Sequence, residues 1–388
     1  MHFAFAIFRY FPYGGLQLDM RNIAAACINA GHEVTVYTTL WEDDLIPGVN
    51  VIEIPIPQKP TRKRDRAFAL ALLKEMKLSH HDLVVGFNKI PGVDIYYCGD
   101  GCYAAKAFEK HGIFHRLTLR SRVAFRMEKA VFQKGIGTEF LVIARNQIRE
   151  YQRYYKTEGH RFFVIPPGIS RGFIAPANRL EHTRKIRGQL KIPLDKQVVT
   201  MVASNLKLKG YERSFKALMA LPEQVLSKTI LLLVGADKHI QAYKKQARET
   251  GLGDHVMFLG GRKDVPEILF GSDALIHPAY REAAGNVILE AAVAGVPVIC
   301  TKTCGYSFYI SENNLGIVLN EPFSQADLNT ALSKMLTDAK LRQVWQANTR
   351  LFSENNEIFS RISMVVNLFE QKVAKKQKQS TCKGVSLK

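Results

Sequence analysis

The residues best suited to chemistry lie between positions 277 and 291, in the sequence HPAYREAAGNVILEA. Two carboxylates there are separated by seven residues: Glu282 falls in a turn, and Glu290 follows about two helical turns later. Carboxylate oxygens can accept hydrogen bonds from the hydroxyls of a ribose or another sugar. The alternative is a helix with two solvent-facing acids, which its alanine-rich, packable sequence disfavours. The motif therefore predicts a sugar or nucleotide site.

Two strand-to-helix turns have residues that suit a phosphate. Gly14-Gly15 opens a helix, whose free N–H groups and partial positive charge attract an anion. The turn 203–210 (ASNLKLKG) carries Lys207 and Lys209, which are compact charges for phosphate oxygens. Each turn alone is also compatible with an ordinary turn or a solvated basic loop. Neither matches the usual dinucleotide or P-loop patterns, so those two classes of site are disfavoured.

Parallel sheets must position these turns, because short apolar runs alternate with helical segments along the chain. The pattern pauses at Pro166-Pro167-Gly168 and restarts at Gln197, and 388 residues exceed one ordinary core. The predicted fold class is α/β, with two doubly wound Rossmann-like domains facing each other across a cleft. The predicted parts are an N-terminal domain (1–168), a C-terminal domain (169–355), a terminal helix returning to the first domain (356–372) and a disordered basic tail (373–388).

The composition and the net charge of the chain limit the classes of partner that the protein is expected to bind. The chain has 54 Lys and Arg against 35 Asp and Glu, a net charge of +19 that favours nucleic acid, nucleotide phosphates or an anionic membrane. No nucleic-acid-binding motif occurs, and no run of about 18 apolar residues predicts a transmembrane helix. Cys98/Cys102 and Cys300/Cys304 have C-x3-C spacing, which is not a usual zinc pairing. Scattered cysteines in a chain of this size indicate reduced thiols and a cytoplasmic location.

The segment 106–134 is basic and amphipathic, with eight Lys or Arg residues and two Glu. This pattern fits contact with an anionic membrane surface, and it fits a surface helix over the core equally well. The residues predicted to contact the membrane or the acceptor are Arg116, Arg120, Arg122, Arg126 and Lys129.

The sequence resembles the retaining GT-B glycosyltransferases of family 4, and within them the lipopolysaccharide-core glucosyltransferases. The broad family is indicated by the carboxylate motif, by Tyr10-Phe11-Pro12 with the double glycine, and by Pro166-Pro167-Gly168-Ile169. The narrower group is indicated by Phe87-Asn88-Lys89 and by Asp100 with Cys102-Tyr103. The resemblance implies a GT-B fold and transfer of glucose from UDP-glucose to a heptose of the lipopolysaccharide inner core. It also implies that the N-terminal domain (1–168) lies on the acceptor side and that the C-terminal domain (169–355) binds the nucleotide sugar.

The resemblance also implies roles for individual residues. Glu282, with the backbone N–H groups that follow it, holds the hydroxyls of the donor sugar; Glu290 binds the ribose. Donor binding is assigned to Gly14, Gly15, Arg171, Lys207, Lys209, Glu282, Ala283, Ala284, Gly285 and Glu290. Catalysis is assigned to Asp100, Glu282 and Asp19. Leu208 departs from the family pattern, which has an arginine there, and this puts one phosphate contact in question.

A metal-free mechanism is expected. The diphosphate leaving group gains charge, which fixed cations and backbone donors can stabilise, and the chain contains no D-x-D motif to bridge a metal. The expected partners are a UDP-sugar, the inner-core acceptor and the anionic inner membrane surface, with no cofactor and no nucleic acid. The enzyme is expected at the cytoplasmic face of the inner membrane. The alternatives are another donor or acceptor, or a non-catalytic protein that binds sugar nucleotides.

Overall fold

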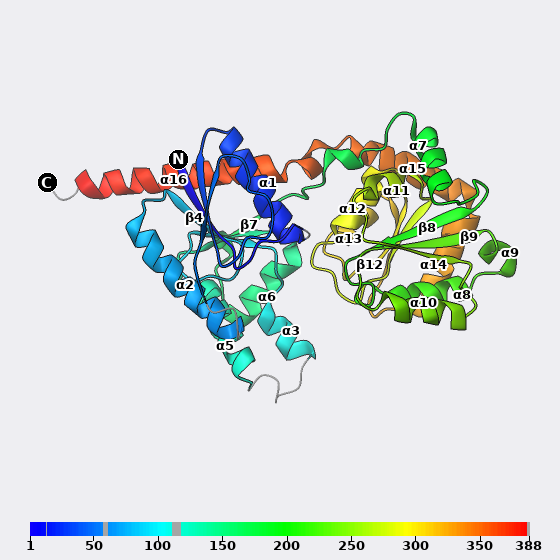
Figure 1. The fold of residues 1–388 in the computed structure, drawn as a ribbon, viewed down its shortest axis with the longest axis horizontal. Helices are drawn as coiled ribbons and strands as arrows, with labels where there is room; N and C mark the ends of the chain where they lie inside the picture. The colour runs from blue at the N-terminus through cyan, green and yellow to red at the C-terminus, as the bar shows by residue number, and fades with distance from the viewer. Residues whose placement is uncertain (13, 57–60, 111–117, 386–388) are drawn as a thin grey trace. The chain divides into compact units, whose positions relative to one another are not determined.

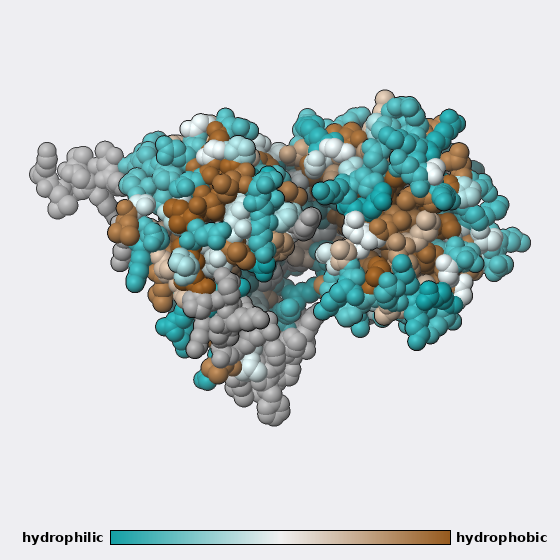
Figure 2. Space-filling model, in the orientation of Figure 1, coloured by the Kyte–Doolittle hydropathy of each residue, from teal (hydrophilic) through white to brown (hydrophobic). Residues whose placement is uncertain are grey.

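A computed structural model of the chain describes residues 1–12, 14–56, 61–110 and 118–385. The chain forms two compact units (Figure 1). The first comprises Met1–Pro167 and Ser360–Lys388, and the second is the continuous segment Gly168–Phe359. On the face shown in Figure 2, hydrophilic residues are spread over the surface of each unit and hydrophobic residues form smaller patches. Each unit has its own apolar core.

The first unit is a seven-stranded parallel sheet in the order β3-β2-β1-β4-β5-β6-β7. Strand β1 lies between β2 and β4 and is buried from Phe3 to Ala6, as a strand covered on both faces must be. The strands are β1 (His2–Ala6), β2 (Glu33–Thr38), β3 (Val49–Glu53), β4 (Leu83–Gly86), β5 (Ile95–Cys98), β6 (Glu139–Val142) and β7 (Phe162–Val164). The helices are α1 (Gly15–Asn29), α2 (Thr61–Leu78), α3 (Tyr103–Lys110), α5 (Leu119–Phe132), α6 (Arg145–Tyr155) and α16 (Arg361–Val385), with the 3₁₀ turn η1 (Gly159–Arg161).

The second unit is a six-stranded parallel sheet in the order β10-β9-β8-β11-β12-β13. Its strands are β8 (Gln197–Val202), β9 (Thr229–Val234), β10 (Val256–Gly260), β11 (Ala274–His277), β12 (Val298–Thr301) and β13 (Gly316–Leu319). Its helices are α7 (Arg179–Gln189), α8 (Tyr211–Met219), α9 (Glu223–Leu226), α10 (Ile240–Glu249), α11 (Val265–Phe270), α12 (Asn286–Val293), α13 (Ser307–Glu312), α14 (Gln325–Thr337) and α15 (Ala339–Ser353), with 3₁₀ turns η2 (Arg171–Phe173) and η3 (Asn356–Phe359). The predicted pair of doubly wound sheets is confirmed.

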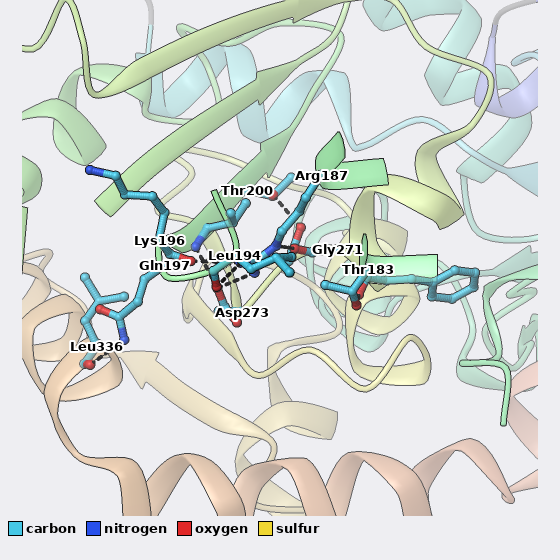
Figure 3. Close-up of polar contacts among 12 residues, drawn as sticks. Thr183, Arg187, Leu194, Lys196, Gln197, Thr200, Gly271, Asp273 and Leu336 are labelled. Atoms are coloured by element: carbon cyan, nitrogen blue, oxygen red, sulfur yellow. Dashed lines mark hydrogen bonds and ion pairs between the residues drawn. The ribbon is translucent and has the colours of Figure 1, made fainter. Parts of the chain in front are cut away.

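A buried arginine fixes the beginnings of β8 and β11. Arg187 of α7 donates to the Gly271 carbonyl (2.9 Å) and pairs with Asp273 (2.7 Å), as Figure 3 shows. The same Asp273 carboxylate accepts the backbone N–H of Val198 at 2.7 Å. Because Asp273 precedes β11 and Val198 lies in β8, one carboxylate aligns the two strands. Their opposite, carboxyl ends carry the loops described below.

The last helix returns to the first unit and differs from the sequence prediction. A helix was expected to end near residue 372 and a disordered tail to follow, but α16 continues to Val385. Phe369 packs edge-on against the rings of Phe3 and Phe5. Beyond it Val373 is buried, and Lys376 pairs with Asp94 at 2.5 Å. The start of the segment expected to be disordered is therefore held against the first unit by a buried valine and an ion pair.

Candidate active site

The candidate site lies where the strand order of the second sheet reverses. β8 pairs with β9 on one side and with β11 on the other, so the connections leave in opposite directions at their carboxyl ends. Ligands of open α/β sheets bind at such a switch point. The loop 203–210 follows β8, and the loop 278–285 follows β11. These are the two loops of the second half that the sequence singled out.

The centre of the site is an ion pair between these loops. The Lys209 ammonium lies 2.5 Å from a Glu282 carboxylate oxygen, and His277 Nε2 lies 3.3 Å from the same oxygen. Burial alone would raise the pKa of Glu282, but the hydrogen bond from His277 and the charge of Lys209 outweigh it and lower the pKa to about 2. Glu282 is therefore a carboxylate at neutral pH, ready to accept sugar hydroxyls beside a fixed positive charge.

The two loops are locked together by backbone contacts. Tyr280 donates its backbone N–H to the Leu208 carbonyl at 3.0 Å. Gly210 has φ +87°, and a Cβ there would lie 2.2 Å from the Pro278 carbonyl oxygen, so only glycine fits. Arg213 donates to the same oxygen at 3.0 Å. These contacts fix the distance between Lys209 and Glu282 before any ligand arrives.

Aromatic rings hold Arg213 in place from two sides. Its guanidinium carbon lies 3.7 Å from the centroid of the Tyr280 ring and 3.6 Å from that of Phe323. Burial is the main cause that lowers the pKa of Arg213, and the cation–π contacts compensate part of the lost hydration. Sequence analysis did not single out Arg213, because its partners come from elements distant in the chain.

Several polar groups around the second loop lack partners among the residues that the structure describes. Burial raises the pKa of Glu290, on α12, to about 7, and no cation or hydrogen-bond donor offsets it there. His277 Nδ1, Arg281 Nη1 and Asn286 Oδ1 are buried without a hydrogen bond in the same described part of the chain. Such groups are costly, so a polar ligand that supplies the missing bonds is expected here.

The segment after Glu282 is shaped by its neighbours. Gly285 precedes α12 with φ +90°, and a Cβ there would lie 3.1 Å from Glu282 Cγ. The Ala284 carbonyl accepts the backbone N–H of Tyr306 at 2.8 Å. The structure thus brings Lys209, Glu282 and the stretch Ala283–Gly285 together. Glu290 follows on the helix that this stretch begins.

Two further residues of the second unit were predicted to bind the donor, and their hydrogen bonds in the described part of the chain do not involve the Lys209–Glu282 pair. Lys207 is exposed, and its carbonyl accepts the backbone N–H of Gly210 at 3.2 Å. Arg171, on η2, donates to Asn356 Oδ1 at 2.9 Å and stacks over the Phe359 ring at 4.6 Å. Its guanidinium is therefore engaged with η3. A phosphate contact by Arg171 remains a prediction.

The remaining donor and catalytic predictions lie in the first unit. Gly14 precedes α1 and Gly15 is its first residue, where an added Cβ would meet no atom within 4 Å. Asp19, on α1, accepts the Tyr97 hydroxyl at 2.7 Å and pairs with the buried Arg361 at 3.1 Å. The carboxylate expected to face an acceptor is thus bound by groups that fasten α16 to the unit.

Asp100 is exposed just after β5, and the turn around it rests on a buried ion pair that sequence analysis did not predict. Glu128, fully buried, lies 2.8 Å from the Lys89 ammonium and accepts the Tyr103 backbone N–H at 2.7 Å. Lys89 also donates to the Gly101 carbonyl at 2.8 Å. The sequence did hint at this ion pair, because it connects the two motifs that indicated the narrower group. Lys89 belongs to Phe87-Asn88-Lys89, and Tyr103, which bonds Glu128, belongs to Asp100-x-Cys102-Tyr103.

The predicted membrane contacts fall on α5. Arg122, Arg126 and Lys129 are exposed, whereas Val131 and Phe132 pack into the core of the unit. Arg120 lies in the first turn of α5, and Arg116 falls outside the described residues. The helix therefore covers the core with one side and presents a basic side to solvent. Within the described ranges, no helix is long and apolar enough to cross a membrane.

Comparison with known proteins identifies two family models along the chain. Residues 13–172 match "Glycosyltransferase Family 4" and residues 182–352 match "Glycosyl transferases group 1". Lipopolysaccharide glucosyltransferase WaaG of Escherichia coli K12 is 39% identical over 360 residues, covering 92% of this chain and 95% of that protein. A crystal structure of WaaG superposes with a TM-score of 0.88 at 38% identity, covering 95% of this chain and 99% of that one. Anabaena HepE, solved with UDP-glucose, shares the fold at 17% identity and a TM-score of 0.72, covering 98% of this chain and all of that one.

Proposed function

The chain belongs to glycosyltransferase family 4, and on that premise we propose that it transfers glucose from UDP-glucose to a heptose of the lipopolysaccharide inner core, with retention of anomeric configuration. The observation that carries the proposal is the 39% identity to a lipopolysaccharide glucosyltransferase over 92% of the chain. The ion pair between Lys209 and Glu282 at the switch point also supports the proposal. A site for a sugar nucleotide needs a carboxylate that accepts hydrogen bonds from the sugar hydroxyls, next to a positive charge that attracts the phosphates.

Each group of the site has a place in this reaction. Glu282 and the backbone after it hold the glucose, Glu290 accepts the ribose hydroxyls, and Lys209 faces the diphosphate. Cleavage of the anomeric C–O bond leaves negative charge on the diphosphate and positive charge on the sugar. Lys209 stabilises the negative charge on the diphosphate, and the Glu282 carboxylate stabilises the positive charge on the sugar. We therefore propose that no metal cofactor is needed. We propose that the first unit binds the acceptor and that Asp100, exposed there, lies close to the donor sugar as a catalytic residue.

A donor-ranking experiment tests the function. UDP release is measured with UDP-glucose, UDP-galactose and UDP-N-acetylglucosamine, each with a heptose-terminated acceptor. UDP-glucose should give the highest turnover, unchanged in excess EDTA. A preference for another sugar nucleotide would show that UDP-glucose is not the donor. UDP binding without turnover would make the protein a sensor, and a loss in EDTA that magnesium restores would overturn the metal-free mechanism.

UDP affinity is expected to fall as the pH drops below 7. The pKa of Glu290 is about 7 in the free protein, and ribose hydroxyls bind its ionised form. Below that pKa a proton must leave on binding, which weakens affinity by about tenfold per pH unit. Calorimetric titration of UDP between pH 8 and 5.5 measures the slope. Glu290→Gln removes the titrating group and serves as the control, so an equal slope in both proteins would refute the assignment.

We propose that the protein binds peripherally to the cytoplasmic face of the inner membrane through α5, because the helix exposes three basic residues. Each contributes on the order of 1 kcal/mol at an anionic surface. Replacing Arg122, Arg126 and Lys129 with Gln should weaken binding to anionic vesicles by about a hundredfold at low salt. The matched control replaces three exposed basic residues of the second unit, Lys238, Lys245 and Arg248, with Gln. Equal sedimentation of both variants with the vesicles would contradict the α5 contact.

A further inference from the structure

The turn that carries Asp100 (residues 99–102, sequence GDGC) has little rigidity of its own. A glycine lies on each side of Asp100, and a glycine backbone can adopt more conformations than that of any other residue. The turn is also outside the regular elements, because β5 ends at Cys98 and α3 begins at Tyr103. The exposed Asp100 side chain therefore keeps one position only if contacts from elsewhere fix the backbone that carries it.

Side chains from two other parts of the first unit hold the carbonyl groups of this turn. Lys89, which follows β4, donates to the Gly101 carbonyl at 2.8 Å. On α6, Gln147 and the Tyr151 hydroxyl both donate to the Asp100 carbonyl at 3.3 Å. The two peptide groups that follow Asp100 are therefore both fixed by hydrogen bonds.

Glu128 of α5 holds the end of the turn, where α3 begins. Its carboxylate accepts the backbone N–H groups of Tyr103 at 2.7 Å and Ala104 at 2.9 Å, which are the first two residues of α3. N–H groups at the start of a helix have no acceptor within it, and a negative charge is favourable there. The Tyr155 hydroxyl, at 2.5 Å, and the Lys89 ammonium, at 2.8 Å, bind the same carboxylate. One carboxylate therefore fixes both the start of α3 and the ammonium that holds the turn.

The Glu128 carboxylate divides these donors between its two oxygens: Lys89 and the Tyr103 N–H bind one, and the Ala104 N–H and the Tyr155 hydroxyl bind the other. A carboxylate accepts at both oxygens, but an amide would turn its NH2 group toward two of these donors. A buried ion pair adds little net stability, because lost hydration offsets the attraction. The geometry that the pair imposes therefore explains its presence better than the stability that it adds.

Lys89 links Glu128 to Asp100 by charge. Burial alone would lower the pKa of Lys89, but the charges of Glu128 and Asp100 outweigh it and raise the pKa. We propose that Lys89 and Glu128 are positioning residues, which fix the turn so that the Asp100 carboxylate is held in one place during sugar transfer. This role rests on the function proposed above, in which Asp100 is a catalytic residue. Lys89 and Glu128 act through Asp100 without touching the substrate.

The test compares Glu128→Gln with the wild type in the full chain and measures the turn and the reaction separately. The amide protons of Tyr103 and Ala104 should exchange with deuterium about tenfold faster, because an amide is a poorer acceptor than a carboxylate. Exchange in β1 and β4 should not change. Turnover, kcat, should fall about tenfold or more, because a small misplacement of a catalytic group is costly. KM for UDP-glucose should stay within about twofold, because the proposed nucleotide site belongs to the second unit.

A second variant separates positioning from loss of stability. Glu128→Gln leaves the Lys89 ammonium buried without its counter-ion, whereas Lys89→Met/Glu128→Gln removes both charges together. The double variant should therefore unfold at about the same urea concentration as the wild type. It should show the same fall in kcat with KM unchanged, because it still lacks the bonds that hold the turn. Loss of stability without loss of kcat in either variant would overturn the proposal.

Glu158→Gln is the matched control. Glu158 is in the same unit, accepts the Gly135 backbone N–H at 2.8 Å and pairs with the buried Arg161 at 2.9 Å, but these partners precede β6 and β7. This variant should keep the wild-type kcat. Unchanged amide exchange or wild-type kcat in folded Glu128→Gln, or an equal fall of kcat in Glu158→Gln, would refute the positioning role. Faster exchange in a protein whose wild type shows no turnover would support the fixed turn and refute the proposed function instead.

Discussion

Glu282→Gln is expected to lower turnover at least a hundredfold while leaving the protein folded. The amide keeps the size of the side chain but loses the charge that Lys209 and His277 hold ionised at neutral pH. It can no longer stabilise positive charge on the sugar, and it leaves the Lys209 ammonium without its counter-ion. A hundredfold loss corresponds to about 2.7 kcal/mol of transition-state stabilisation. The measurement is kcat and KM for UDP-glucose.

Glu267→Gln provides a matched control for this effect. Glu267 is also in the second unit and also faces a histidine, with His182 Nδ1 2.8 Å from its carboxylate, but it lies on α11 and outside the candidate site. This variant should keep wild-type turnover. If Glu282→Gln keeps more than about a tenth of the activity, a loss below about 1.4 kcal/mol, the carboxylate does not hold the sugar.

Gly210→Ala should destabilise the second unit and inactivate the site together. Its φ of +87° costs an alanine about 1–2 kcal/mol. In addition, the Cβ at 2.2 Å from the Pro278 carbonyl oxygen would push the two loops apart, breaking the bond from Tyr280 N–H to Leu208. We expect a total loss of about 3 kcal/mol in the free energy of unfolding and at least a tenfold loss of turnover. Urea unfolding and the UDP-release assay measure the two effects.

Gly251→Ala separates backbone strain from the clash. Gly251 has φ +74°, yet an added Cβ there meets no atom within 4 Å. This variant should lose only the strain, about 1–2 kcal/mol, and keep its turnover. Equal losses of stability in the two variants would show that the contact with Pro278 does not lock the loops.

The fold followed from local patterns, because buried parallel strands are short apolar runs that any window of the sequence reveals. The apolar run DALIH predicts a strand over 273–277, and β11 occupies Ala274–His277. For α2 the apolar periodicity predicts a helix only from about residue 66 and places the basic residues before it in a loop, whereas the helix begins at Thr61. Basic side chains give little apolar periodicity, so the first turns of such a helix are not visible in the pattern.

The sequence allowed the residues of the candidate site to be identified, but it did not allow the contacts between them to be predicted. Glu282 and Lys209 stood out because carboxylates and lysines at strand ends suit a sugar diphosphate, but their pairing depends on strand order in the sheet. Asp19 is a second example. The family resemblance assigned it to the acceptor cleft, whereas its ion-pair partner Arg361 comes from a segment more than 300 residues later in the sequence. No local pattern carries that information.

The return of the chain through α16 has a consequence for the order in which the protein is made. The second unit, Gly168–Phe359, is one uninterrupted stretch, whereas the first lacks its last helix until the residues after Phe359 have been synthesised. Until then Phe3 and Phe5 lack the ring of Phe369, and Asp19 lacks Arg361. On the ribosome the second unit can therefore complete its core before the first, although the first is synthesised earlier. The unit that emerges first is the one that finishes folding last.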